Sequence, residues 1–145
     1  MIEQRASARW QGSLKDGVGA FHAGTLAGDY SFSSRFEGGR GSTPEELIGA
    51  AHASCFSMAL SLFLGQQGHT PVAIDTTARV HLDPEKLAIV RIELDTEAEV
   101  PGMSDAEFRE CAEQAKAGCP VSKALAGVEI VLASARLRQP VMERV

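Results

Sequence analysis

The stretch TPEELIGAAHASCFSMALSLFL, residues 43–64, decides the fold. Thr43 stands where a helix N-cap belongs, Pro44 fits the first helical position, and Glu46 follows three residues after the cap. After Glu46 no residue of the stretch carries a formal charge, so the predicted helix is apolar around nearly its whole circumference. Such a helix must be covered on every side, which predicts a central buried helix and a second chain that helps to cover it.

A membrane-spanning helix is the alternative reading of this stretch, because its uncharged length reaches the lower end of what a bilayer requires. Gly49, His52, Ser54 and Ser57 dilute the hydrophobicity, and no cluster of Lys or Arg flanks either end. We therefore expect the helix to be the core of a protein that does not enter the membrane.

Composition narrows the class of protein. A chain of 145 residues predicts a single domain over 1–145 that is large enough to bury a real core. The net charge of −5 argues against partners such as nucleic acid or an anionic membrane surface. The N-terminal residues MIEQRASARW lack the apolar segment of a signal peptide, and three cysteines are an odd number for a disulfide framework. We expect a cytoplasmic protein with free thiols.

The segments before the central helix are predicted to be strands. Residues 5–15 resemble an edge strand anchored by Trp10, and residues 18–23 and 30–36 are predicted as two further strands. The glycine-rich segment 38–42 then leads into the helix.

The segments after the central helix alternate between strand and helix patterns. Residues 72–82 and 88–95 alternate apolar and polar positions on either side of a turn, which predicts an antiparallel hairpin with one wet face. A helix capped by Ser104, a short helix after Cys119 and a closing strand over 128–138 follow, and we expect alternate residues from Val131 to Leu137 to face inward. This order predicts an α+β fold.

The three cysteines have different local surroundings. Cys55 lies within the apolar helix, where burial raises a thiol pKa and makes the group inert unless a cation faces it. Cys119 precedes Pro120 and so falls at a helix N-cap, where the positive end of the helix dipole favours a thiolate. Local physics alone thus marks Cys119 as the more acidic thiol. Cys111 lies on an amphipathic helix and is interpreted as a packing residue.

A metal site is the rival use of these cysteines. His52 and Cys55 are one helical turn apart, and Cys111 and Cys119 would add two thiolates, giving ligand types suited to zinc. The spacings match no compact zinc motif, so a His52 that is hydrogen-bonded in the core or at an interface is the preferred interpretation.

Several motifs resemble the OsmC branch of the OsmC/Ohr family, bacterial proteins of osmotic and peroxide stress. They extend in the same order over nearly the whole chain: RFEG (35–38), TPEELIGAAHASCFSMAL (43–60), IDTTA (74–78) and AKAGCPVSKAL (115–125). The resemblance implies an OsmC-like fold, in which antiparallel sheets wrap around the long central helix of an intertwined homodimer.

The resemblance also implies roles for individual residues. Cys55 resembles the peroxidatic cysteine of the family and Cys119 the resolving cysteine, which reverses the assignment from local physics. Glu45 matches the acidic site residue. Arg35 matches the arginine of the OsmC branch, with Arg40 as the nearby competitor. A guanidinium would supply the cation that a buried Cys55 needs.

The implied activity is that of a cysteine-based peroxidase that reduces organic hydroperoxides to alcohols through a sulfenic acid and a Cys55–Cys119 disulfide. An external dithiol, of lipoyl type by resemblance, would reduce that disulfide, and no metal or organic cofactor is implied. A stress protein that binds an apolar ligand without catalysis is the alternative.

The position of Glu45 predicts a contact between subunits. It lies ten residues before Cys55, which is about 15 Å along a straight helix, so the two side chains cannot touch within one chain. Two helices that cross antiparallel at the small residues around Ala50 would bring Glu45 of one chain opposite Cys55 of the other.

Overall fold

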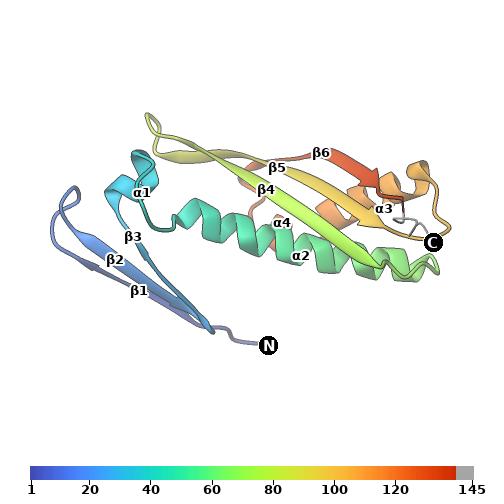
Figure 1. Ribbon diagram of the computed structural model, residues 1–145, viewed down its shortest axis with the longest axis horizontal. Coiled ribbons are helices and arrows are strands. Elements are labelled where there is room, and N and C mark those ends of the chain that lie inside the picture. The colour runs from blue at the N-terminus through green and yellow to red at the C-terminus, as the bar shows by residue number, and fades with distance from the viewer. Residues whose placement is uncertain (140–145) are drawn as a thin grey trace, which may run out of the picture. The chain divides into compact units, whose positions relative to one another are not determined.

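The computed structural model describes residues 1–139, which form two compact units, residues 1–47 and 48 onward. The first unit contains β1 (Ala6–Gln11), β2 (Val18–Ala23), β3 (Leu26–Tyr30), α1 (Phe32–Phe36) and the first turn of α2 (Pro44–Gln66). The second contains the rest of α2 and β4 (Ala73–Asp83), β5 (Ala88–Glu99), α3 (Asp105–Gly118), α4 (Pro120–Ala124) and β6 (Glu129–Leu137) (Figure 1). The order confirms the predicted α+β class, while a single domain over 1–145 stays a prediction.

The first unit is a three-stranded antiparallel sheet in the order β1-β2-β3. All residues of β1 are exposed, as expected for an edge strand. The Tyr30 ring lies directly over Gly19, where a Cβ would come within 2.5 Å of the ring, so only glycine fits there. Tyr30 also packs against Trp10 at 5.6 Å between ring centroids.

The predicted strand over residues 30–36 is wrong. The strand lies earlier, at Leu26–Tyr30, and the chain then turns into the short helix α1. The cause is a capping box: the backbone N–H of Ser34 donates to the Ser31 hydroxyl oxygen at 3.0 Å, and the Ser31 N–H donates to Ser34 Oγ at 2.9 Å. These two bonds start a helix in a segment whose aromatic residues favour a strand.

The central helix begins as predicted. The Glu46 backbone N–H donates to Thr43 Oγ1 at 3.0 Å, and Pro44 is the first helical residue. Before it, Gly41 has a φ of 113°, a conformation that only glycine adopts readily, so the glycine-rich segment is the turn between α1 and α2.

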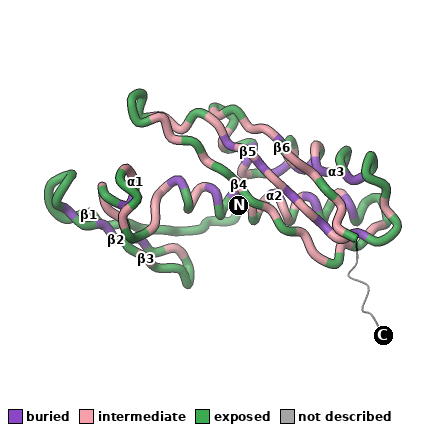
Figure 2. Tube along the Cα trace, turned by 45° about the horizontal axis from the view of Figure 1, so that its top comes forward, coloured by how far each residue is buried: buried purple, intermediate pink, exposed green. Residues whose placement is uncertain are grey.

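The second unit contains the core. Its sheet has the order β4-β5-β6, with β4 antiparallel to β5 as predicted and β6 parallel to β5. Because parallel strands need a crossover, α3 and α4 connect β5 to β6. Buried and half-buried residues alternate along β5 (Figure 2). Fully buried side chains from α2, β5 and α3 form one cluster, including Phe56, Leu60, Leu64, Ile92, Leu94 and Phe108.

The inner face of β6 differs from the prediction of alternate residues Val131 to Leu137. A bulge shifts the register so that Leu94 pairs with Leu132 and Asp95 pairs with Ser134, which leaves Ala133 exposed. Leu132 is buried before the bulge, and Ala135 and Leu137 pack on the core after it.

Helix α2 is long and apolar enough to cross a membrane by length and composition. One side of it is fully buried in the core at Phe56, Leu60 and Leu64. On another side Met58 and Leu62 are 77% and 59% exposed, so the cover that an apolar helix requires is incomplete in one chain.

Candidate active site

The structure brings Cys55 and Cys119 together. Cys55 lies in the middle of α2 and is half-buried, whereas Cys119 is completely buried at the N-cap of α4. The Cys119 thiol and the backbone amide of Val121 both act on the pKa of the Cys55 thiol, so the two cysteines lie close together, and both are free. Two free thiols, one from α2 and one from the start of α4, are therefore neighbours in the core.

The surroundings of Cys55 work against its ionisation. Burial is the largest cause that raises the pKa of the Cys55 thiol, and the neighbouring Cys119 thiol raises it further. The Val121 amide lowers the pKa, because an N–H donor stabilises a thiolate, but the net direction is upward. A reactive thiolate at this position needs a cation.

Arg35 and Glu45 form a tight ion pair within the first unit. Arg35 lies in the last turn of α1 and Glu45 in the first turn of α2. Arg35 Nη2 donates to Glu45 Oε1 at 2.6 Å, and Nε donates to Oε1 and Oε2 at 3.0 and 3.3 Å. Since the carboxylate holds the guanidinium from more than one atom, the orientation of Arg35 is fixed.

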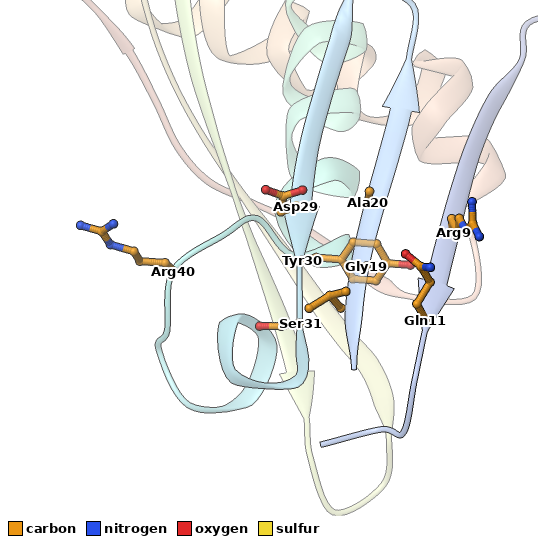
Figure 3. A pocket seen from close by; sticks show the side chains of 9 residues that line it. Arg9, Gln11, Gly19, Ala20, Asp29, Tyr30, Ser31 and Arg40 are labelled. Atoms are coloured by element: carbon orange, nitrogen blue, oxygen red, sulfur yellow. The ribbon is translucent and has the colours of Figure 1, made fainter. Parts of the chain in front are cut away.

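Arg40 is placed differently from Arg35. It lines a cavity of about 420 Å³ on the three-stranded sheet, together with Arg9, Gln11 and Asp29. In Figure 3 its side chain is directed away from the other labelled residues. Of the two arginines that the sequence offers, Arg35 is the one that donates hydrogen bonds to Glu45.

A second cavity of about 280 Å³ lies beside Arg35, and sequence reasoning missed it. Most of its lining is aromatic or apolar, and Arg35 is its charged residue. The residues that line it are Trp10, Leu14, Tyr30, Ser31, Phe32, Arg35 and Phe36. The Arg35 guanidinium lies 5.5 Å from the centre of the Phe36 ring. The signal in the sequence was the recurrence of Phe around Arg35, which α1 places on one short helix.

His52 is fully buried and hydrogen-bonded in the core, as the preferred interpretation of the sequence expected. Its Nε2 atom lies 2.7 Å from Ser122 Oγ on α4. Burial lowers the pKa of His52 below its ordinary value, because the charged ring is poorly solvated there.

The rival metal site has no support in the geometry. Residues 1–139 contain no group of three or more His, Cys, Asp or Glu side chains placed to hold a metal ion. Cys111 is buried in the core cluster on α3. Burial and the charges of Glu110 and Glu107 raise the pKa of Cys111, which suits a packing residue.

An α+β fold that places a half-buried free thiol beside a second, buried free thiol is typical of a dithiol redox protein. More particularly, the chain belongs to the family described as OsmC-like protein, whose profile matches residues 37–133.

Curated relatives agree that the chain belongs to this family. The chain is 50% identical over 129 residues to Peroxiredoxin OsmC of Escherichia coli (strain K12), covering 86% of this chain and 90% of that protein. It is 32% identical over 93 residues to the Organic hydroperoxide resistance protein of Xanthomonas axonopodis pv. citri (strain 306), covering 62% and 63%. The crystal structure of an OsmC-like protein from Mycoplasma pneumoniae shares the fold, with a TM-score of 0.71 at 15% identity and coverage of 94% and 99%.

Proposed function

We infer that the chain is a thiol-dependent peroxidase of stress defence that reduces organic hydroperoxides to alcohols. The observation that carries this function is that the free thiols of Cys55 and Cys119 are neighbours in the core. Relatives named for peroxiredoxin activity and for hydroperoxide resistance support it.

The reaction uses the two thiols in sequence. The Cys55 thiolate attacks the O–O bond of the hydroperoxide, an alcohol leaves, and Cys55 becomes a sulfenic acid. The Cys119 thiol then attacks that sulfur: the S–S bond forms, the S–O bond breaks, and the hydroxyl leaves with the thiol proton as water. Cys119 suits this second role because it is fully buried, so an external peroxide reaches Cys55 first.

Arg35 supplies the cation in this proposal. The raised pKa of Cys55 calls for a positive charge, and a guanidinium also offers donors to a peroxide oxygen. Glu45 acts as a positioning residue that fixes the guanidinium through its short contacts. The aromatic cavity beside Arg35 favours an alkyl hydroperoxide over hydrogen peroxide, since its walls bind an apolar group.

The active form is proposed to be an intertwined homodimer. The exposed side chains of Met58 and Leu62 on a central helix support it, because a second chain would cover them. An antiparallel crossing of two α2 helices near Ala50 would bring the Arg35–Glu45 pair of one chain to Cys55 of the other. An external dithiol of lipoyl type in a reducing cytoplasm completes the cycle.

The two cysteines give the direct test of function. Thiol titration before and after sub-stoichiometric tert-butyl hydroperoxide should show two thiols lost per peroxide in the wild type. Cys55→Ser should abolish the reaction, and Cys119→Ser should react once and then over-oxidise to sulfinic acid. A wild type that loses no thiols would favour the alternative, a protein that binds an apolar ligand without catalysis. A Cys55→Ser variant that still consumes peroxide would reverse the roles of the two cysteines.

A mixed dimer tests which chain supplies Glu45. One chain carries Cys55→Ser and the other Glu45→Ala, and the heterodimer is isolated with two different affinity tags. If Glu45 acts across the interface, the intact Cys55 meets the intact Glu45 and one site per dimer recovers. Activity no higher than that of the Glu45→Ala homodimer would show that Glu45 acts within its own chain.

A further inference from the structure

Two links run side by side between α2 and α4. One is the approach of Cys55 to Cys119, whose thiol acts on the pKa of Cys55, and the other is the hydrogen bond of 2.7 Å between His52 and Ser122. His52 precedes Cys55 by three residues, and Ser122 follows Cys119 by three, so each link lies one helical turn from the other. The bond that holds His52 against Ser122 therefore also restrains the position of Cys119 relative to Cys55.

The His52 side chain depends on Ser122. The ring is fully buried, and its Nδ1 atom has no hydrogen-bond partner in the part of the chain that the structure describes. The bond to Ser122 is therefore the only side-chain hydrogen bond that the structure records for this ring. A buried polar group that loses its last partner costs more than an ordinary hydrogen bond, because no water replaces it.

Helix α4 is short, and its buried residue makes the same bond. It has five residues, of which Ser122 is the buried one, and its N-cap Cys119 makes no side-chain capping bond. Cys119, the proposed resolving cysteine, thus stands at the start of a helix that has no side-chain capping bond at that end. Disulfide formation requires the two sulfur atoms to approach to about 2.05 Å with a restricted dihedral angle, so small shifts of α4 matter.

We propose that His52 and Ser122 form a positioning pair that holds Cys119 against Cys55 and thereby sets the rate at which the Cys55 sulfenic acid is resolved. This inference rests on the proposed function. The pair takes no part in the attack on the peroxide. It acts on the second step, in which the Cys119 sulfur replaces the hydroxyl on Cys55 and water leaves.

Ser122→Ala is the variant that isolates this role. It removes the hydroxyl and leaves the helix intact, because alanine favours a helix. We expect the first step, the reaction of Cys55 with peroxide, to stay within about twofold of the wild type, and resolution to slow about tenfold, the effect of one hydrogen bond. Ser122→Thr keeps the hydroxyl and should restore resolution. His52→Leu should reproduce the defect, while His52→Gln, which can place a nitrogen near Nε2, should restore part of the rate.

Ser57→Ala is the matched control. Ser57 lies on α2, as His52 does, and its hydroxyl donates to Thr76 Oγ1 at 2.8 Å. The variant therefore removes a comparable hydrogen bond from α2 that does not involve His52 or Ser122. It should leave both steps unchanged. Equal slowing in Ser57→Ala and Ser122→Ala would mean that general loosening of the helix is the cause, and would overturn the inference.

Single-turnover kinetics give the measurement. Stopped-flow mixing with one equivalent of tert-butyl hydroperoxide resolves the two steps, and mass spectrometry counts sulfinic acid at Cys55, which should accumulate in Ser122→Ala as resolution slows. If the wild type forms the Cys55–Cys119 disulfide and Ser122→Ala forms it at the same rate, the positioning role is refuted alone. If the wild type forms no such disulfide, the proposed function fails and the inference fails with it.

Discussion

Replacing Arg35 by alanine should destabilise the protein more than replacing its partner Glu45, because the two side chains differ in exposure. The Arg35 side chain is 36% exposed and the Glu45 side chain is 10% exposed. Removal of Arg35 leaves a nearly buried carboxylate without its cation. Removal of Glu45 leaves a guanidinium that water already reaches.

The magnitudes follow from this asymmetry. Breaking a buried ion pair by removing one partner costs about 3–5 kcal/mol. Water can enter the space that a 36% exposed arginine vacates, so we lower the expected loss for Arg35→Ala to about 2 kcal/mol. Glu45→Ala should cost about 1 kcal/mol or less, as for pairs with one solvated member.

Urea unfolding at one fixed protein concentration measures both losses, since a dimer's stability depends on concentration. Arg79→Ala is the control: Arg79 also bridges two carboxylates, Asp95 at 2.9 Å and Glu93 at 2.8 Å, but its side chain is 48% exposed. That variant should change stability little. A Glu45→Ala loss equal to or above that of Arg35→Ala would refute the reasoning, as would an Arg35→Ala variant no weaker than the control.

Further predictions concern stability, packing and assembly. Burial keeps the pKa of His52 below 6.5, so the unfolded chain binds a proton at this ring more readily than the folded chain does. The free energy of unfolding should therefore fall as the pH drops below 6.5. Urea titrations at several pH values measure this fall, which His52→Leu should flatten. Phe108→Ala should cost about 3–5 kcal/mol in the same assay, because the ring is fully buried. Met58→Glu should break the dimer and lower the free energy of unfolding with it, because the central helix loses the cover of the second chain; a wild type that sediments as a folded, active monomer would contradict the proposed homodimer.

Much of the fold is predictable because local signals and tertiary packing agree. Thr43 and Pro44 start α2 where the sequence predicts, and the Glu107 N–H donates to Ser104 Oγ at 3.2 Å at the start of α3. The alternation along residues 88–95 identifies β5, because one face of that strand is buried and the other is half-buried. In each case a pattern within a few residues determines the element.

The failures come from signals that compete or that lie on another strand. Around Phe32 the aromatic residues favour a strand, but the two hydrogen bonds between Ser31 and Ser34 start a helix instead. The inner face of β6 was missed because the bulge at Ala133 depends on pairing with β5, which no period within residues 128–138 reveals. The inward-facing residues of β6 can therefore be assigned only once the pairing of β6 with β5 is known.

The thiols show what tertiary packing adds to the surroundings that the sequence predicts for each cysteine. The sequence correctly places Cys119 at a helix N-cap, and that position should favour a thiolate on Cys119 itself. In the folded chain the Val121 amide at the start of that helix instead acts on the sulfur of Cys55, whose pKa it lowers against the effect of burial. The helix terminus identified from the sequence is present, and the packing of α4 on α2 brings one of its amides close enough to act on the other cysteine. Which of two thiols the amides of a helix terminus act on is a property of tertiary structure, which the positions of the cysteines in the sequence do not reveal.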